Sequence, residues 1–255
     1  MNAASRMRIA GIAGAALLLG ACTTAPVAPM PTVAAVALDR YLGTWHEIAL
    51  IPNRFQAQCA GDTQAEYLRE DDRLRVINRC RLADGSPESA RGVAHAVEGS
   101  NNAKLRVSFF RPFYGDYWIL ALDPNYRRVL VGEPGRRYGW ILSRTPVMAE
   151  AEVAALLDRA EALGYDRRAF APSPRLAETW QCGDGVRLRS TLTPTDELIL
   201  ELGDERRRLR AMPAASGTRY GDETFVFRTK GDAAHVERAG QPLHPDCRRV
   251  AGKGG

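Results

Sequence analysis

Ser216 and Lys230 are the residues whose chemistry and placement raise a functional question in this sequence. A Ser-Gly turn precedes the β-like run "TFVFRT", and a lysine beside a glycine ends that run. A hydroxyl and an ammonium therefore bracket one short pair of expected strands. Taken singly, a Ser-Gly turn or a terminal lysine is usually an ordinary solvated feature. Their meaning depends on the elements that carry them.

No strong catalytic or metal-binding motif accompanies this pair. The sequence has no Gly-x-Ser-x-Gly elbow, no zinc-type histidine pair and no glycine-rich phosphate loop. His235, His244 and Cys247 form only a weak metal cluster, because we expect Cys247 to be in a disulfide. We therefore expect no catalytic residues, no metal and no cofactor. An esterase acting on lipid is the enzymatic alternative, and hydrolysis of a chromogenic ester would support it.

The first residues predict export and lipidation. Arg6 and Arg8 precede an apolar run at 9–21, which is too short to span a membrane, so residues 1–21 are predicted to be a signal peptide. The run ends in "LGAC", which resembles a bacterial lipobox. That resemblance implies cleavage before Cys22 and attachment of acyl chains such as palmitate. A plain signal peptide with a chance cysteine is the alternative.

An uncharged tether follows the cysteine. The proline-rich residues up to 37 show neither helical nor strand periodicity, which favours an extended spacer over 22–37. Thr23 occupies the position where, in the families this resembles, Asp would argue for retention in the inner membrane. We therefore expect a lipid-anchored protein on the periplasmic face of the outer membrane.

Four further cysteines are available for disulfides. An even number in an exported chain suggests two bridges, and four cysteines allow three pairings. Local pairing favours Cys59–Cys80 and Cys182–Cys247, one in each half of the chain. In the chain-entropy model, the second bridge would stabilise its half by roughly 4 kcal/mol.

The formal net charge of +5 does not indicate a nucleic-acid partner. Part of this excess lies in the signal peptide and the linker, and each half of the chain is close to neutral. The dense basic run "ERRRLR" at Glu205–Arg210 lacks aromatic residues that would stack on bases. A solvated strand end or turn explains that run better, and we expect no nucleic-acid binding.

Short strands dominate residues 38–171. Aliphatic and aromatic runs recur about every ten residues between turns such as "DPNY" and "EPGR". The clearest runs are 105–110, 117–122, 127–132 and 138–143. This spacing is typical of an up-and-down meander, which avoids open edges by closing into a barrel.

One helix is expected after these strands. Thr145 is its predicted N-cap, Pro146 its first residue and Gly164 its stop. The apolar stripe that would pack on the barrel consists of Val153, Leu156, Leu157 and Ala160. Residues 172–178 are then expected to form a linker, and residues 179–250 a smaller domain of short strands without a helix.

The first half resembles the bacterial outer-membrane lipocalins over nearly all of residues 38–170. Gly43 and Trp45 stand in the opening Gly-x-Trp signature, and the segments "FFRPFYGDYW" and "WILSRTP" are more specific. The resemblance implies an eight-stranded up-and-down barrel with one C-terminal helix. It also implies that Trp45 and Arg144 meet at the closed end as a structural pair. His46 departs from the tyrosine that is usual in this branch.

Barrels of this size can hold one small apolar molecule. The lipocalin resemblance implies a fatty acid or a lysophospholipid as the ligand. A filled barrel without a physiological ligand is the alternative.

The second half resembles the membrane-bound, c-type-specific lysozyme inhibitors over residues 179–247. The carriers of this resemblance are "SGTRY" at 216–220, "TKGDAA" at 229–234 and the flanking cysteines. The resemblance implies a small antiparallel β-barrel whose Ser216 and Lys230 enter the lysozyme cleft, with Gly217 and Tyr220 among the contacts. Lysozymes use two carboxylates for glycoside hydrolysis, and an ammonium can pair with the ionised one.

Two functions follow from this all-β organisation. In the first, an anchored lipoprotein combines a lipid-binding barrel with an inhibitor of c-type lysozyme. In the second, the protein is a lipid carrier for envelope maintenance, and its C-terminal module is not inhibitory. The Lys230→Ala substitution discriminates, because only the first function predicts a loss of inhibition.

Overall fold

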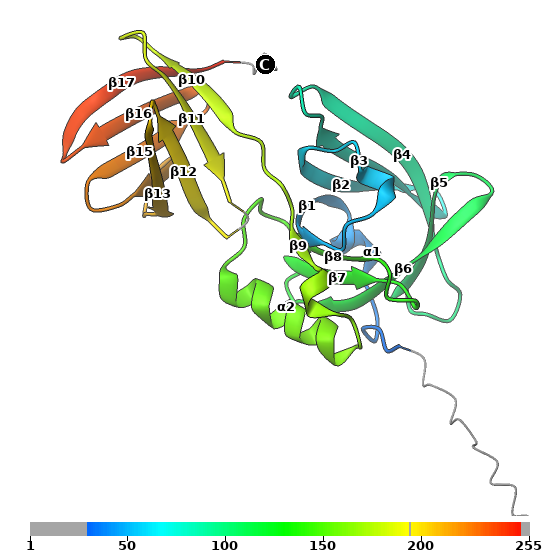
Figure 1. Ribbon diagram of the computed structural model, residues 1–255. Coiled ribbons are helices and arrows are strands. Elements are labelled where there is room, and N and C mark those ends of the chain that lie inside the picture. Colours follow the sequence, from blue (N-terminus) through cyan, green and yellow to red (C-terminus); the bar gives the residue numbers. More distant parts are fainter. Residues whose placement is uncertain (1–29, 194, 251–255) are drawn as a thin grey trace, which may run out of the picture.

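The computed structural model describes residues 30–193 and 195–250, which form two antiparallel β-barrels joined by a short connection (Figure 1). The predicted signal peptide, Cys22 and the first part of the tether lie outside the described residues. The all-β prediction with two successive barrels is confirmed. Within the described residues, no helix has the length and apolar character needed to cross a membrane.

Eight strands close the first barrel in up-and-down order. Each strand pairs with the next, and β1 also pairs with β8, which closes the ring. The four strongest predicted runs correspond to the last four of these strands. The strands are β1 (Gly43–Leu50), β2 (Gly61–Glu70), β3 (Arg73–Arg81), β4 (Pro87–Ala96), β5 (Lys104–Phe110), β6 (Phe113–Leu122), β7 (Arg128–Gly132) and β8 (Gly139–Ser143).

Short helices and one long helix complete the first barrel. The helix α1 (Leu38–Tyr41) precedes β1 and covers one end of the barrel, whereas the 3-10 helix η1 (Arg54–Gln56) follows β1. The long helix α2 (Glu150–Ala162) packs on the outside of β6 and β7. Its predicted apolar stripe does pack against the barrel, and Ala160 is fully buried there.

The start of α2 differs from the prediction. The helix begins at Glu150, with Ala149 in an extended conformation, and Thr145 is not its N-cap. The Thr145 hydroxyl donates instead to the carbonyl of Val147, while the Thr145 amide donates to Ser143 Oγ. These local bonds compete with the first helical turn. Gly164 follows the helix with φ +86°, as the predicted stop requires.

The second barrel is smaller and also consists of eight strands. They are β10 (Glu178–Cys182), β11 (Arg187–Leu192), β12 (Glu197–Leu202), β13 (Glu205–Ala211), β14 (Thr218–Gly221), β15 (Phe225–Lys230), β16 (Ala233–Arg238) and β17 (Gln241–Val250). The ring closes where β10 pairs with β17. Its core includes Trp180, Leu209, Phe225, Phe227 and Val236, which the two-residue alternation turns inward.

The basic run at Glu205–Arg210 lies within strand β13 rather than at a strand end or turn. Leu209 faces the core, whereas Arg206 and Arg208 are exposed on the outer wall. Across the sheet, the Arg206 guanidinium lies 3.7 Å from the Glu201 carboxylate, and the Arg208 guanidinium lies 2.7 Å from the Glu197 carboxylate. Two charges of the run are therefore paired with glutamates of the neighbouring strand β12, and Arg207 pairs with Glu205 of the run itself.

The described part of the predicted tether and the predicted linker both pack on the first barrel. In the predicted tether, Met30 and Val36 are buried, and the amide of Val33 donates to the carbonyl of Ile119. In the expected linker, β9 (Ala171–Pro172) pairs with β1, after the 3-10 helix η2 (Arg167–Ala169). The connection between the barrels is therefore held against the wall of the first barrel.

Candidate functional site

Ser216 and Lys230 lie next to each other at one edge of the second barrel. Ser216 lies two residues before the short strand β14, and Lys230 ends β15. The two strands pair directly, with Thr218 opposite Thr229 and their hydroxyl oxygens 2.7 Å apart. Both Ser216 and Lys230 are exposed. The pairing of β14 with β15 therefore brings the backbone at Ser216 close to the backbone at Lys230, although the two residues are 14 positions apart in sequence.

Gly217 allows this close approach. It has a φ of +71°, and a Cβ at this position would lie 2.0 Å from the carbonyl oxygen of Thr229. A side chain would also come within 3.3 Å of the Cα of Lys230. Only glycine tolerates both the backbone conformation and the contact, so the motif glycine keeps the serine loop against the lysine strand.

Tyr220 has a different place from the one expected of a contact residue. Its ring is buried in the core of the second barrel, opposite Phe227, and its hydroxyl donates to Asp196 at 2.8 Å. Burial and then the bond to Asp196 raise the pKa of Tyr220. Tyr220 therefore supports the serine loop from below, whereas Ser216, Gly217 and Lys230 form the exposed edge.

The surroundings of Lys230 favour an acidic partner. Among the described residues, Lys230 forms no ion pair, and its ammonium is exposed. Arg219 and Arg228 face each other on the adjoining outer wall. Arg228 pairs with Glu237 at 3.2 Å, so its charge is partly neutralised. Chemically, the edge offers an exposed ammonium and a hydroxyl that can donate a hydrogen bond.

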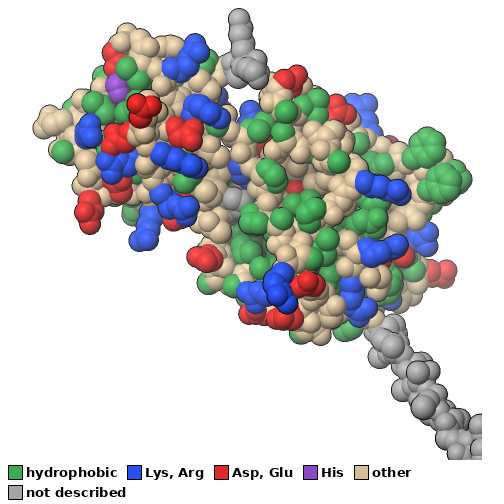
Figure 2. All heavy atoms as spheres, in the orientation of Figure 1, with side chains coloured by type: hydrophobic (Ala, Val, Ile, Leu, Met, Phe, Trp, Pro, Cys, Tyr) green, Lys and Arg blue, Asp and Glu red, His purple; other side chains and the backbone are tan. Residues whose placement is uncertain are grey.

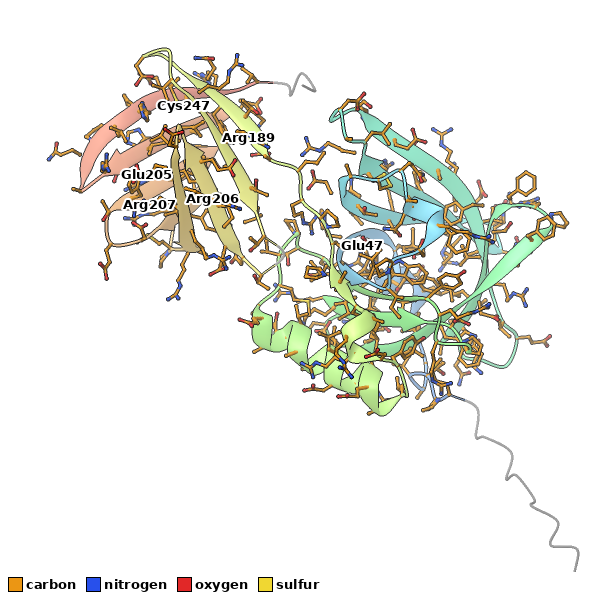
Figure 3. All side chains as sticks on the ribbon, in the orientation of Figure 1. Glu47, Arg189, Glu205, Arg206, Arg207 and Cys247 are labelled. Atoms are coloured by element: carbon orange, nitrogen blue, oxygen red, sulfur yellow. A yellow bond between two sulfur atoms is a disulfide. The ribbon has the colours of Figure 1, made fainter. Side chains whose placement is uncertain are left out.

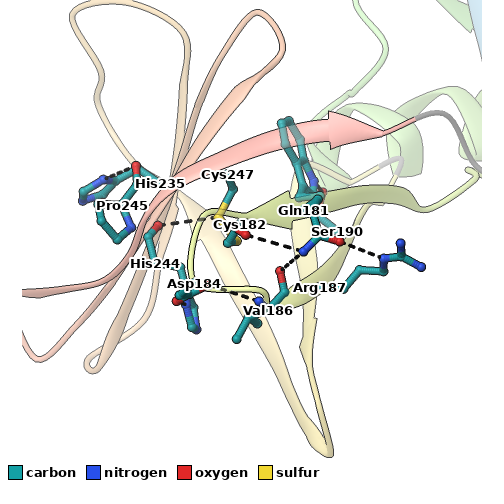
Figure 4. Close-up of a disulfide and its surroundings, with 11 residues drawn as sticks. Gln181, Cys182, Asp184, Val186, Arg187, Ser190, His235, His244, Pro245 and Cys247 are labelled. Atoms are coloured by element: carbon teal, nitrogen blue, oxygen red, sulfur yellow. Dashed lines mark hydrogen bonds and ion pairs between the residues drawn. A yellow bond between two sulfur atoms is a disulfide. The ribbon is translucent and has the colours of Figure 1, made fainter.

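The disulfide Cys182–Cys247 joins the first and last strands of the second barrel (Figure 4). These are the cysteines that the sequence pairs. Beside the bridge, His244 Nδ1 lies 2.5 Å from Asp184 Oδ2, and this hydrogen bond lowers the pKa of Asp184. Because its sulfur is in the bridge, Cys247 is not free to bind a metal with His235 and His244.

The inner face of the first barrel is partly exposed toward one end, and this exposed inner region is here called the hollow. Directly paired residues share a face of a sheet, and two ladders run from buried core residues into exposed ones. Trp45, Ala65, Asn78 and Ala90 form one ladder, and Ala94, Val107 and Gly115 form the other. Ala90 and Gly115 face inward yet are exposed. Solvent therefore enters the barrel between small side chains from one end.

The other end of the barrel is sealed by aromatic side chains. Tyr41, Trp45 and Tyr67 are buried, and the hydroxyls of Tyr41 and Tyr67 each lie 2.8 Å from the hydroxyl of Tyr117. Burial raises the pKa of Tyr67 to about 12, so the phenol stays neutral. Tyr117 remains partly exposed, which places a polar group at the floor of the hollow.

Trp45 and Arg144 meet at this closed end. The Arg144 guanidinium carbon lies 3.9 Å from the centre of the Trp45 ring, a cation–π contact. The same guanidinium donates to the carbonyls of Thr44 and Arg40 at 2.8 Å each. Gly43, with φ +91°, leaves room for the guanidinium. This arrangement caps backbone carbonyls and is structural.

Sequence reasoning missed a buried carboxylate in the first barrel. Glu47 is almost fully buried in the wall, where Gln56 donates to both carboxylate oxygens and the Ser173 hydroxyl donates to Oε1 at 2.8 Å (Figure 3). Burial raises the pKa of Glu47 despite these bonds. The only sequence signal was an acid at an inward position of β1, and its partners are distant in sequence.

Two other predicted positions have clear surroundings. The disulfide Cys59–Cys80, the expected local pair, ties the η1 loop to the end of β3. His46 pairs with Gln64 and Ser143 in the wall, and burial followed by the charge of Arg175 lowers its pKa. The imidazole is therefore neutral and causes no break in strand pairing.

Comparison with known proteins agrees with both halves. Residues 36–175 match the lipocalin-like domain, and residues 180–243 match the membrane-bound lysozyme-inhibitor of c-type lysozyme. Outer membrane lipoprotein Blc of Escherichia coli (strain K12) is 40% identical over 161 residues, covering 62% of this chain and 90% of the relative. Temperature-induced lipocalin-1 of Arabidopsis thaliana is 39% identical over 146 residues, covering 54% of this chain and 78% of the relative. The solved structure of lobster apocrustacyanin A1 aligns with a TM-score of 0.46 and 16% identity, covering 58% of this chain and 92% of the apocrustacyanin chain.

Proposed function

The chain belongs to the lipocalin-like family and carries a lysozyme-inhibitor domain behind the lipocalin barrel, and we propose that it is an anchored lipoprotein with two binding functions. The second barrel inhibits c-type lysozyme, and the first holds a lipid. Acylated Cys22 anchors the protein in the outer membrane on its periplasmic face. Both domains bind rather than catalyse.

The edge formed by Ser216 and Lys230 carries the inhibitor function. Lys230 inserts between the two catalytic carboxylates of the lysozyme and pairs with the ionised one, while the Ser216 hydroxyl donates to the other. Inside a cleft shielded from water, such a charge-assisted bond is strong. The exposure of both side chains and the tight packing of Gly217 on the Thr229–Lys230 backbone support this proposal.

Lysozyme activity titrated with the purified protein tests the inhibitor function. Lys230→Ala should weaken inhibition by at least about 30-fold, since removal of one partner from a buried charge pair costs about 2 kcal/mol or more. Arg206→Ala is the matched control, because it removes an exposed cation from β13 and should leave inhibition unchanged. Equal inhibition by the wild type and the Lys230→Ala variant would reject the mechanism.

The hollow of the first barrel carries the lipid-binding function. It opens at one end, is lined by small residues such as Ala65 and Ala90, and ends on the Tyr117 hydroxyl. A single acyl chain fits this shape, and we propose a fatty acid or a lysophospholipid as the ligand.

A further inference from the structure

One end of the first barrel carries all the large exposed hydrophobic side chains of the described residues. They are Phe55, Phe109, Phe110 and Phe113. Phe55 lies in the connection between β1 and β2, and the other three lie at the β5–β6 hairpin. In an up-and-down barrel, the β1–β2 and β5–β6 connections lie at the same end. Figure 2 shows hydrophobic side chains projecting from this hairpin. Such a cluster of exposed apolar side chains marks an interaction surface.

The hairpin tip is an aromatic knob. Phe110 and Phe113 are 75% and 70% exposed, and their rings stack at 6.2 Å with only 7° between their planes. Phe55 is 59% exposed. The paired strands hold the two stacked rings outside the barrel, where neither contributes to the core.

Arginines adjoin both groups of phenylalanines. Arg54 lies 5.5 Å from the centre of the Phe55 ring, and Arg111 stands between Phe110 and Phe113 in sequence. Behind the knob, a groove of about 280 Å³ is lined by Arg75, Arg91 and Arg111 together with Phe109. Arg91 and Arg111 form no ion pair within the described part of the chain.

A buried hydroxyl in this groove lacks a partner. Ser108 is 3% exposed, and its Oγ has no hydrogen-bond partner among the described residues. A buried polar group without a partner is unfavourable, and this residue lines the groove. The single carboxylate there, Glu70, lies 2.9 Å from Arg73 and 3.8 Å from Arg75, which leaves the groove net positive.

We propose that this end of the barrel docks on a phospholipid bilayer. Phe110 and Phe113 enter the acyl region, while the groove of Arg75, Arg91 and Arg111 takes the phosphate of a lipid headgroup through charge-assisted bonds. Aromatic side chains flanked by cations suit the boundary between acyl chains and phosphates. A second copy of the chain fits less well, because it would bring like-charged arginines together.

The length of the tether agrees with this orientation. Eight peptide units separate Cys22 from buried Met30, and they reach at most about 29 Å. The tether segment is bonded to Ile119 through Val33, and Ile119 lies six residues along β6 from Phe113, or roughly 20 Å. An anchor at Cys22 and the aromatic knob can therefore reach the same membrane surface.

Docking would serve the proposed lipid function. The hollow opens at the end that carries the knob, since Ala90 and Gly115 lie near the β3–β4 and β5–β6 turns. A lipid could then pass between the bilayer and the barrel without crossing water. This consequence depends on the proposed ligand, whereas docking itself does not.

Vesicle flotation tests the docking. The probe is residues 22–255 with Cys22→Ser, which keeps every described residue and removes the acyl chains. Vesicles of phosphatidylethanolamine and phosphatidylglycerol should bind it. The double variant Phe110→Ser/Phe113→Ser should bind at least about tenfold more weakly. Arg91→Gln/Arg111→Gln should lose the preference for anionic vesicles. The control Arg206→Gln/Arg208→Gln, which removes the same charge from β13, should bind like the parent.

Three further readouts decide between the possible occupants. Tryptophan at position 110, introduced as Phe110→Trp, should shift its emission to the blue with vesicles but not with millimolar inorganic phosphate. Absence of vesicle binding, or equal binding by the phenylalanine variant, would overturn the proposal. So would light scattering in which the phenylalanine variant converts a dimer to a monomer. Lysozyme inhibition, measured on the same preparations, reports the proposed function of the second barrel separately. Thermal unfolding followed by circular dichroism shows whether the first barrel of each variant is folded.

Discussion

Gly217 determines how closely the Ser216 loop approaches the strand that ends in Lys230. Its role rests on a close contact with the Thr229 carbonyl, not on flexibility, because the added Cβ would overlap that oxygen. Gly231 provides a natural comparison: it also has a positive φ, of +59°, but a Cβ there would meet nothing within 4 Å. Comparing alanine variants of the two glycines therefore distinguishes the effect of backbone strain, which both positions share, from the effect of close approach, which only Gly217 shows.

We predict that Gly217→Ala weakens lysozyme inhibition far more than Gly231→Ala does. In both variants, an alanine held in the left-handed backbone conformation costs about 1–2 kcal/mol. Only Gly217→Ala must also move the Ser216 loop away from Lys230. Inhibition should fall by about tenfold or more in the first variant. Titration of lysozyme activity, together with thermal unfolding of each variant, measures both effects. Equal inhibition by the two variants would contradict the role of the contact.

Glu47 is a second position where one residue sets a measurable property. Its folded-state pKa is raised, chiefly by burial, so folding favours the protonated carboxyl. The stability contributed by protonation is fully present below the ordinary pKa of the carboxyl and is lost as pH rises through the raised one. Relative to Glu47→Gln, the wild type should therefore lose free energy of unfolding as the pH rises above the ordinary range of a glutamate carboxyl. Urea unfolding of both proteins over this rise in pH measures the difference in their free energies of unfolding. The other carboxylates contribute equally to both proteins and therefore cancel in the difference. Parallel pH profiles would show that Glu47 does not titrate as proposed.

The strands and the helix show where sequence patterns suffice. Aliphatic and aromatic runs located β5 to β8 of the first barrel, because their inward residues must meet the core, but they did not locate β2 to β4. The start of α2 could not be predicted, since Thr145 has a local partner in Val147 that no periodicity reveals. The burial of Tyr220 could have been inferred from the alternating Phe225 and Phe227, whereas the Glu47 cluster joins residues 47, 56 and 173, which only the folded chain brings together.

The inner faces of β2 to β6 allow a test of the hollow at the scale of an element. Ala90→Trp places a large ring in the hollow from an inward position, and Ser89→Trp places the same ring on the outer wall. The first variant should bind a fluorescent long-chain fatty acid at least about tenfold more weakly than the wild type, because the hollow is filled. The second should bind it normally. Comparable affinities for all three proteins would mean that the fatty acid binds elsewhere.

At the scale of the whole molecule, the two barrels are joined by a segment that is itself part of the first barrel. β9 extends the sheet beside β1, and the amide of Ser173 donates to the carbonyl of Ile48. The Arg175 side chain, only 6% exposed, donates to the carbonyls of Glu47 and Pro146 at 2.9 and 2.7 Å. The inhibitor barrel therefore begins within a few residues of a fixed point on the lipocalin wall.

Arg175 tests whether this attachment holds the connection in place. Arg175→Ala removes two charge-assisted bonds, one to the part-buried carbonyl of Glu47 and one to the exposed carbonyl of Pro146, which should cost the first barrel about 2–3 kcal/mol. Proteinase K should then cut between the barrels faster than in the wild type, while lysozyme inhibition by the intact protein stays unchanged because the second barrel has its own core and disulfide. Arg168→Ala, which removes a side chain that is 94% exposed, is the matched control. If both variants resist proteolysis equally, strand pairing by β9 alone fixes the connection, and the two barrels stay coupled without Arg175.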